Sequence, residues 1–155
     1  KEDGSKHYLA VNDAVVARGQ LSKTIDLHLT LDGDEISKYR ADGLLFATPT
    51  GSTAYSLSAG GPILAPKMEC ILMTPVCPHS LFSRSVLFSG ESELSVHVKI
   101  PEECCCVLTV DGEKNVPVLA TDRVVIRKSD LKLKLALLHR NFYKLLNEKL
   151  KERDF

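Results

Sequence analysis

The sequence has no excess of charge of either sign and no apolar tract long enough to cross a membrane. Its 155 residues include 20 lysines and arginines and 20 aspartates and glutamates, so no net charge favours binding to nucleic acid or to an anionic membrane surface. The longest apolar run is far shorter than the roughly 20 residues that a transmembrane helix needs. Residues 1–6 contain neither a start methionine nor a signal-peptide pattern. We therefore expect no nucleic-acid or membrane partner, and a chain whose upstream part is missing.

Cysteine pairs of the kind that bind zinc or build a disulfide framework are also missing. The cysteines are odd in number and include no C-x-x-C pair: Cys70, Cys77, Cys104, Cys105 and Cys106. Consecutive residues of a strand point to opposite faces, so the last three are not expected to bridge one another. Cys77 lies two residues from His79, but nothing nearby completes the three or four ligands that a zinc site requires. We predict reduced thiols, a cytoplasmic location and no metal site.

Apolar and charged residues, at 44% and 26%, occur in the proportions of a soluble globular domain. Strict alternation over residues 25–31 and 94–100 predicts half-buried strands, and Asp32-Gly33 predicts a hairpin turn. The same alternation over residues 131–137 predicts a last strand with a lysine-bearing face. From residue 139 the apolar period becomes helical. Because strand-like runs recur roughly every 8–12 residues, we predict a mainly β fold, a two-layer β-sandwich with one short helix and one C-terminal helix.

The stretch from residue 41 to residue 66 carries the densest set of turn and helix signals. An apolar strand candidate ends at Pro49, because proline has no N–H to donate to a sheet. Small hydroxyl residues beside Gly51 are N-cap candidates, and a helix start with free N–H groups can bind an anion or a ribose phosphate. The pair Gly60-Gly61 then ends this helix. By residue type alone, an ordinary strand-to-helix connection in a core explains the stretch equally well.

An amide and a carboxylate, Asn12 and Asp13, interrupt the apolar run of residues 7–18, for which we predict a strand. Buried polar side chains are costly unless they are hydrogen-bonded to the protein or to a ligand. A β-bulge or turn in which both side chains meet backbone groups is one explanation, and a ligand site is the other. The residues alone leave both open.

Four literal strings resemble the NAD kinase family, which phosphorylates the 2′-hydroxyl of the adenosine ribose of NAD. The longest, D-G-x-x-x-x-T-P-T-G-S-T-A-Y-x-x-S-x-G-G-P, runs from residue 42 to residue 62. The string T-P-V-C-P-H-S-L at residues 74–81 is close to the family form T-P-I-C-P-H-S-L. Asn12-Asp13 matches a further motif, and Asp111-Gly112-Glu113 matches the family's D-G-Q with glutamate in place of glutamine. Neither a P-loop nor a G-x-S-x-G elbow fits the longest string.

The resemblance implies that this chain binds NAD. Asn12 and Asp13 would hold the adenosine moiety, and Tyr55 would lie against the adenine ring. The other residues of that adenine pocket would be Thr53, Ala54 and Ser58. Arg40 and Asp42 would reach the substrate bound mainly by a neighbouring subunit, because the family forms homodimers or homotetramers whose sites lie between chains. NADP would be the product, and ATP with Mg²⁺ would be the phosphate donor in the full-length enzyme.

The family's catalytic base is an aspartate in a Gly-Gly-Asp-Gly motif of the preceding α/β domain, and this sequence contains no such motif. We therefore predict no catalytic residue in this chain and no activity from it alone. Residues 1–138 are expected to form an NAD-binding β-sandwich, and residues 139–155 a helix that crosses back to pack on the absent N-terminal domain. Two other functions stay open: a related lipid kinase of the diacylglycerol or sphingosine type, and a non-catalytic assembly module that has lost the kinase domain.

Overall fold

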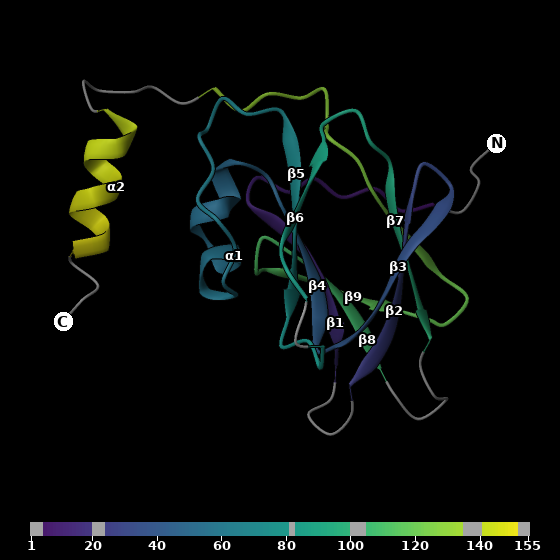
Figure 1. Ribbon diagram of the computed structural model, residues 1–155. Helices are drawn as coiled ribbons and strands as arrows, with labels where there is room; N and C mark the ends of the chain where they lie inside the picture. The colour runs from purple at the N-terminus through teal and green to yellow at the C-terminus, as the bar shows by residue number, and fades with distance from the viewer. Residues whose placement is uncertain (1–4, 20–23, 81–82, 100–104, 135–140, 152–155) are drawn as a thin grey trace.

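The chain forms two antiparallel sheets packed face to face, with a short helical segment on the outer face of the larger sheet (Figure 1). This computed structural model describes residues 5–19, 24–80, 83–99, 105–134 and 141–151. The larger sheet has the strand order β6-β5-β4-β1-β8-β9, and the smaller has the order β10-β7-β2-β3. The mainly β, two-layer fold predicted from the sequence is confirmed.

The strands of the larger sheet are β1 (Asp13–Arg18), β4 (Gly43–Ala47), β5 (Cys70–Val76), β6 (Val86–Ser89), β8 (Cys106–Val110) and β9 (Lys114–Val118). Those of the smaller sheet are β2 (Ile25–Leu31), β3 (Asp34–Ala41), β7 (Leu94–Lys99) and β10 (Arg123–Ile126). The turn between β2 and β3 is the predicted Asp32-Gly33 hairpin, in which both residues have positive φ.

The core lies between the two sheets and follows the alternation read from the sequence. Leu27 and Leu29 of β2 are fully buried, whereas His28 between them points to the outer face. Every residue of β4 is buried, because this strand is covered on both faces. Leu44 packs in the core between the sheets, and Leu45 packs on the other side in a second cluster with Leu64 and Leu72.

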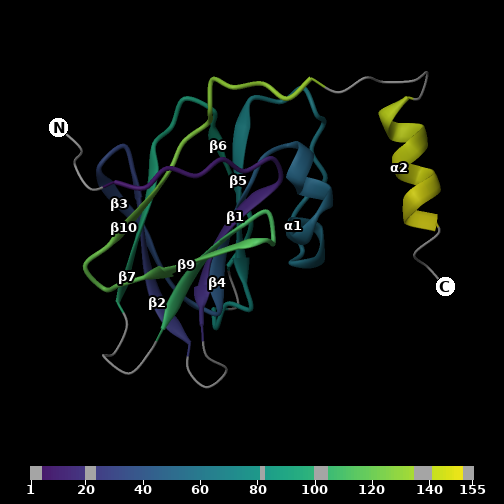
Figure 2. The same cartoon turned by 180° about the vertical axis from the view of Figure 1, so that it is seen from behind.

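The segment between β4 and β5 covers that second face of the larger sheet. It contains a 3₁₀ turn, η1 (Thr50–Thr53), and a single-turn helix, α1 (Tyr55–Ser58). The helix ends before Gly60, whose φ of 87° is readily adopted only without a Cβ. Figure 2 shows from behind that η1 and α1 stand against β4 and β5, away from the smaller sheet. The predicted short helix and its glycine stop are confirmed.

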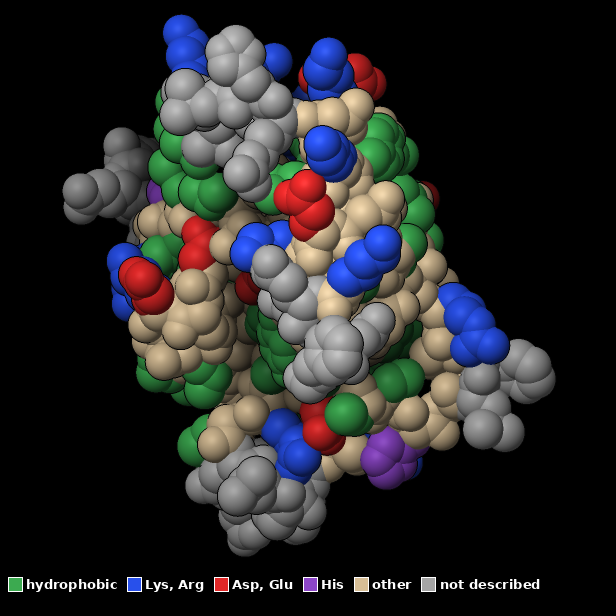
Figure 3. Space-filling model, turned by 90° about the vertical axis from the view of Figure 1, so that its left-hand side faces the viewer, with side chains coloured by type: hydrophobic (Ala, Val, Ile, Leu, Met, Phe, Trp, Pro, Cys, Tyr) green, Lys and Arg blue, Asp and Glu red, His purple; other side chains and the backbone are tan. Residues whose placement is uncertain are grey.

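A C-terminal helix, α2 (Phe142–Lys151), stands apart from the sandwich in both ribbon views (Figures 1 and 2). None of its residues is buried. Its half-buried positions include Phe142, Leu145, Leu146 and Leu150, the apolar stripe expected from the sequence. On the side of the molecule that carries this helix, acidic and basic side chains are interspersed (Figure 3).

Two strand predictions were wrong within the described residues. Residues 127–134 form no strand, and Leu131 and Leu133 are 71% and 64% exposed, because no neighbouring strand pairs with them. The predicted positions 135 and 137 lie outside the described residues. At the other end of the chain, β1 begins only at Asp13 and not near residue 7. The backbone N–H groups just before this strand are used elsewhere, as the next subsection describes.

Candidate functional site

The turn that leads into β1 is held by a single carboxylate from a distant part of the chain. Asp111 accepts hydrogen bonds from three consecutive backbone N–H groups, those of Val11 at 2.7 Å, Asn12 at 2.7 Å and Asp13 at 3.0 Å. Asp111 lies in the turn between β8 and β9 with a φ of 49°, and its own N–H donates to the Asp13 carbonyl oxygen at 2.9 Å. These N–H groups therefore bind a side chain instead of a strand, which is why β1 starts late.

The same turn is clamped from the other side by the segment after β4. Thr48 donates its backbone N–H to the Asn12 carbonyl oxygen at 2.9 Å and its hydroxyl to the Val11 carbonyl oxygen at 2.7 Å. The backbone of Gly51 lies directly against Asn12, so that a Cβ at this position would be 1.9 Å from the Asn12 carbonyl oxygen. Only glycine fits there without moving the turn. Asn12 and Asp13 are thereby fixed beside η1 and α1.

The two carboxylates at this junction have pKa values shifted in opposite directions. Burial raises the pKa of Asp13, which is 5% exposed, and the nearby charge of Asp111 raises it further. Burial alone would also raise the pKa of Asp111, but the three N–H donors outweigh it and hold that pKa below its usual value. Asp111 is thus satisfied as an anion by the protein, whereas the ionised form of Asp13 is disfavoured by its surroundings.

The predicted adenine-pocket residues follow on η1 and α1. Tyr55 is 48% exposed, so its ring projects from the surface and not into the core. Ser58 is also exposed, while Thr53 and Ala54 are half-buried. The structure places all four on the one helical segment that Gly51 locks against Asn12.

The prediction of free N–H groups at this helix start was wrong for the residues that lead into it. The N–H of Gly51 donates to the Thr48 hydroxyl at 3.0 Å, that of Ser52 to the Pro49 carbonyl and that of Ala54 to the Gly51 carbonyl. Neither η1 nor α1 has a side-chain cap. The 3₁₀ turn uses these three donors internally, so they are not available to an anion.

Arg40 and Asp42 lie away from that junction. Arg40 on β3 forms two hydrogen bonds with Asp26, at 2.8 and 2.9 Å, and Asp42 pairs in the same bidentate manner with Arg18. Asp42 precedes β4, whereas Asn12 meets the far end of that strand. Asp13 of β1 lies opposite Ala47 of β4, five residues after Asp42. Because a strand rises about 3.3 Å per residue, the length of β4 puts roughly 16 Å between Asp42 and the Asn12 turn.

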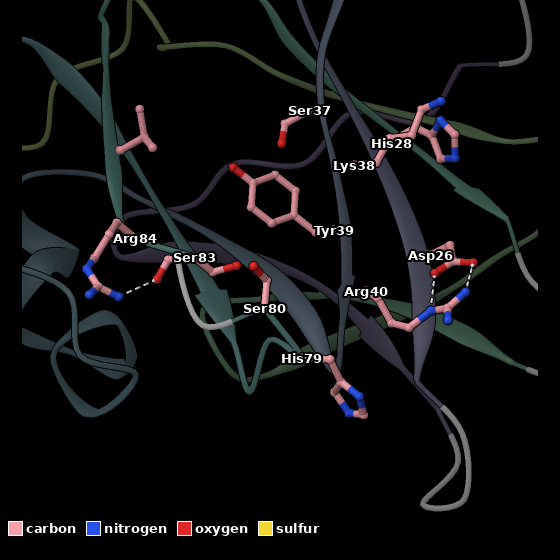
Figure 4. Close-up of a pocket in the computed structure, with 11 residues that line it drawn as sticks. Asp26, His28, Ser37, Lys38, Tyr39, Arg40, His79, Ser80, Ser83 and Arg84 are labelled. Atoms are coloured by element: carbon pink, nitrogen blue, oxygen red, sulfur yellow. Dashed lines mark hydrogen bonds and ion pairs between the residues drawn. The ribbon is translucent and has the colours of Figure 1, made fainter.

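Arg40 borders an open depression of about 870 Å³ between the edge strands β3 and β6. Figure 4 shows the Tyr39 ring at its centre, with Arg84 and Ser83 on one side and the Arg40–Asp26 pair on the other. His79 lines the lower part of the depression in this view, and its backbone N–H donates to the Arg40 carbonyl oxygen of β3 at 2.9 Å. Except for Val86, its lining residues carry polar or charged groups, and they include Arg84 and the Arg40–Asp26 pair, so it suits a hydroxyl-rich or charged ligand.

Sequence reasoning missed Arg18 as the partner of Asp42 and missed what Asp111 binds. The Asp-Gly turn at residue 111 was visible in the sequence, but no local pattern shows that its carboxylate reaches residues about a hundred positions earlier. Arg18 at the end of an apolar strand was a usable signal, because a charged residue beside a buried strand needs a partner.

The expectations about metals, thiols and membranes can be compared with the described part of the chain. It contains no group of three or more histidine, cysteine, aspartate or glutamate residues that could hold a metal ion. The cysteines it includes are unpaired: Cys70, Cys77, Cys105 and Cys106. Burial raises the pKa of Cys106 to about 11. No helix among the described residues is both long and apolar enough to span a membrane.

Comparison with known proteins adds a family match. Residues 11–138 match the family model described as the ATP-NAD kinase C-terminal domain. The NAD kinase of Koribacter versatilis is 42% identical over 144 residues, which are 93% of this chain and 50% of that protein. The NAD kinase of Magnetococcus marinus is 42% identical over 149 residues, covering 94% of this chain and 48% of that protein. The chain thus spans about half the length of the curated relatives it matches.

Two solved structures have closely similar folds. Yeast NADH kinase complexed with NADH superposes with a TM-score of 0.78 and 30% identity, over 94% of this chain and 45% of that one. An NAD kinase from Archaeoglobus fulgidus in complex with ATP superposes with a TM-score of 0.78 and 29% identity, over 99% of this chain and 57% of that one.

Proposed function

The chain belongs to the ATP-NAD kinase family as its C-terminal domain, and from this premise we propose that it is the NAD-binding part of an enzyme that phosphorylates the 2′-hydroxyl of the adenosine ribose of NAD. The observation that carries the proposal is the double clamp on Asn12 and Asp13. Asp111 on one side and Gly51 on the other fix the backbone of the turn that carries an amide and a buried carboxylate, and Gly51 belongs to the same helical segment as the exposed Tyr55.

In this proposal each polar group of the turn has a defined task. The Asn12 amide and the Asp13 carboxylate accept hydrogen bonds from ribose hydroxyls or adenine amino groups. A hydroxyl donor replaces the water that burial removes from Asp13, so binding stabilises its ionised form. Tyr55 stacks on adenine, and the other pocket residues, Thr53, Ala54 and Ser58, contact its edges. These groups orient the ribose and hold it still for reaction.

We place the catalytic base and the ATP site outside this chain. The described residues contain no group of three or more histidine, cysteine, aspartate or glutamate residues that could hold a metal ion. The sequence has no Gly-Gly-Asp-Gly motif. The proposal is supported by the relatives named NAD kinase, which are about twice as long as this chain, and by the apolar stripe of α2, which would pack on a preceding domain.

We further propose that the assembled protein is a homodimer or homotetramer in which Arg40 and Asp42 serve a neighbour's site. Their position at the opposite end of β4 from Asp13 supports this, because one chain then presents two separate surfaces to nucleotide. The depression beside Arg40 is open and lined with polar groups, as a site completed by a second chain would be. The unpaired cysteines are compatible with a cytoplasmic location, which we also propose.

The test compares the full-length protein with this chain alone. We expect the full-length protein to form NADP from NAD and Mg-ATP, and the chain alone to bind NAD in a titration without forming NADP. NADH and a long-chain lipid are offered in parallel as substrates. Phosphorylation of the lipid with no NADP formed would overturn the proposal, and NADP formation by the chain alone would show that the catalytic base and the ATP site lie within this chain, contrary to the proposal.

A further inference from the structure

Three hydroxyl groups form a hydrogen-bonded row beneath α1. The Ser56 hydroxyl lies 3.1 Å from that of Thr74, which lies 3.1 Å from that of Ser85. Ser56 and Thr74 are 0% and 1% exposed, and Ser85 is half-buried. The three residues come from α1, from the middle of β5 and from the residue before β6. We call them the hydroxyl row.

The row joins two surfaces that the proposed function uses. Thr74 pairs with Leu45 across β4 and β5, so its side chain lies on the face of the larger sheet that α1 covers. Ser56 is the only buried residue of α1, and it directly follows Tyr55. At the other end, Ser85 lies between Arg84 and Val86, both of which line the depression beside Arg40 (Figure 4).

Gly61 packs closely against the row. A Cβ added to Gly61 would lie 2.4 Å from the Ser56 hydroxyl and 2.8 Å from that of Thr74, so the glycine that ends the helix also makes room for the row. Thr74 has one hydroxyl proton and two acceptor lone pairs, so it can donate to at most one of its two partners. At least one of Ser56 and Ser85 therefore donates to Thr74, and the loss of the Thr74 hydroxyl affects both ends of the row together.

We propose that Thr74 is a positioning residue that sets the height of α1, and thus of Tyr55, above the sheet and at the same time holds the segment that carries Arg84. The inference rests on the proposed function, because an effect of Thr74 on the KM for NAD is expected only if α1 carries the adenine pocket. A four-residue helix has too few internal hydrogen bonds to keep its own orientation. Its one buried polar anchor is the hydroxyl of Thr74.

The test uses Thr74→Val in the full-length protein, because valine keeps the shape of threonine and removes only the hydroxyl. We expect the KM for NAD to rise about tenfold, which is about 1.4 kcal/mol, with kcat changed much less. Thr74→Ser should restore the KM. Backbone amides of residues 54–61 and 83–89 should exchange hydrogen faster in Thr74→Val than in the parent protein. If Thr74→Val fails to fold, Ser85→Ala tests the outer end of the row, with faster exchange expected in residues 83–89.

Ser95→Ala is the matched control. Ser95 is also a buried hydroxyl with two side-chain partners, Thr30 and Arg123, but it lies in the smaller sheet. It should lower the melting temperature without raising the KM or the exchange of residues 54–61. A Thr74→Val protein that melts lower yet keeps the parent KM and the parent exchange at α1 overturns the inference. If the parent protein binds no NAD, the proposed function fails, and unchanged exchange in both segments would still overturn the inference separately.

Discussion

Asp13 and Asp111 show how two neighbouring carboxylates can differ in what they do for the protein. Asp111 receives three N–H donors and stabilises the fold as an anion. Asp13 is buried beside it and has its pKa raised. The folded chain therefore carries a carboxylate whose ionisation opposes folding. A carboxyl group whose pKa is raised by burial is a candidate for ligand contact, because perturbed pKa values cluster at binding sites.

We expect Asp13→Asn to stabilise the protein at neutral pH and to weaken NAD binding about tenfold. Because the folded-state pKa of Asp13 lies above its unfolded value, the parent loses stability as pH rises from the ordinary carboxyl pKa through the raised one. The variant lacks this loss, so its advantage should vanish in acid. Thermal melting at several pH values and NAD titration measure both effects. A variant that is less stable at neutral pH and binds NAD like the parent would contradict the prediction.

Tyr55→Ala should reduce NAD affinity by roughly 1–3 kcal/mol, or tenfold to hundredfold, because a stacking surface for adenine is lost. The melting temperature should change little, since the ring is already 48% exposed. Tyr55→Phe keeps the stacking surface and should bind almost as the parent does. Both variants are measured in the full-length protein by NAD titration and thermal melting. Equal NAD affinity for Tyr55→Ala and the parent would remove the adenine-pocket assignment.

At the scale of elements, the segment from Thr48 to Gly61 is held against the larger sheet by three sets of contacts. They are the hydrogen bonds of Thr48 to the Val11 and Asn12 carbonyls, the close approach of Gly51 to Asn12, and the hydroxyl row. The segment itself contains only a 3₁₀ turn and a single helical turn. Its orientation therefore depends on these contacts and not on helix propensity.

Gly51→Ala should disturb the segment from Thr48 to Gly61 far more than a glycine substitution at an uncrowded position would. Its Cβ would lie 1.9 Å from a backbone oxygen of Asn12, so the turn must move, and NAD binding should fall by more than about tenfold. Gly60→Ala is the control: the φ of Gly60 is 87°, but a Cβ there meets nothing within 4 Å. It should cost about 1–2 kcal/mol of backbone strain and leave NAD affinity unchanged. Equal losses of affinity in the two variants would contradict this account.

Most elements could be predicted from the sequence because their signals are local. The alternation of residues 25–31 reflects a strand with one buried face, and Gly60 marks a helix end by its own conformational freedom. The strand prediction from Leu131 onward was wrong within the described residues, because alternating apolar residues show that a segment could have one buried face but not that another strand is available to pair with it. For the site, literal strings identified the segments, but the role of Asp111 depends on tertiary contact and has no local pattern.

At the scale of the whole molecule, the pairing of β1 with β4 puts the two proposed nucleotide surfaces at opposite ends of the same two strands. The Asn12 turn lies at one end of the β1–β4 pair, and Asp42 with its partner Arg18 lies at the other. In the proposed assembly, a ligand bound at the Asn12 turn of one chain meets the Asp42 surface of a neighbouring chain. This geometry is what an assembly with shared sites requires.

We therefore expect the full-length protein to sediment as a dimer or tetramer at micromolar concentration. Arg18→Ala, which leaves Asp42 half-buried without its bidentate partner, should weaken NAD binding by reorienting that carboxylate. Lys67→Ala, on the exposed loop after α1, is the control and should change neither property. A strict monomer that still binds NAD with full affinity would rule out the shared site.

The hydrogen bonds of Asp111 also constrain when the site can come into existence. Val11 and Asp111 are 100 positions apart, and β1 must pair with β8 as well as β4 before the sheet is complete. Contacts between residues so far apart in the sequence form late in folding, because closing a large loop costs conformational entropy before the contact can stabilise the chain. During synthesis, a ribosome must therefore release nearly three quarters of these residues before the Asn12 turn can take its final shape. A nascent or prematurely terminated chain that stops before Asp111 would keep the contacts of Thr48 and Gly51 with the Asn12 turn but would lack the carboxylate that binds its three N–H groups.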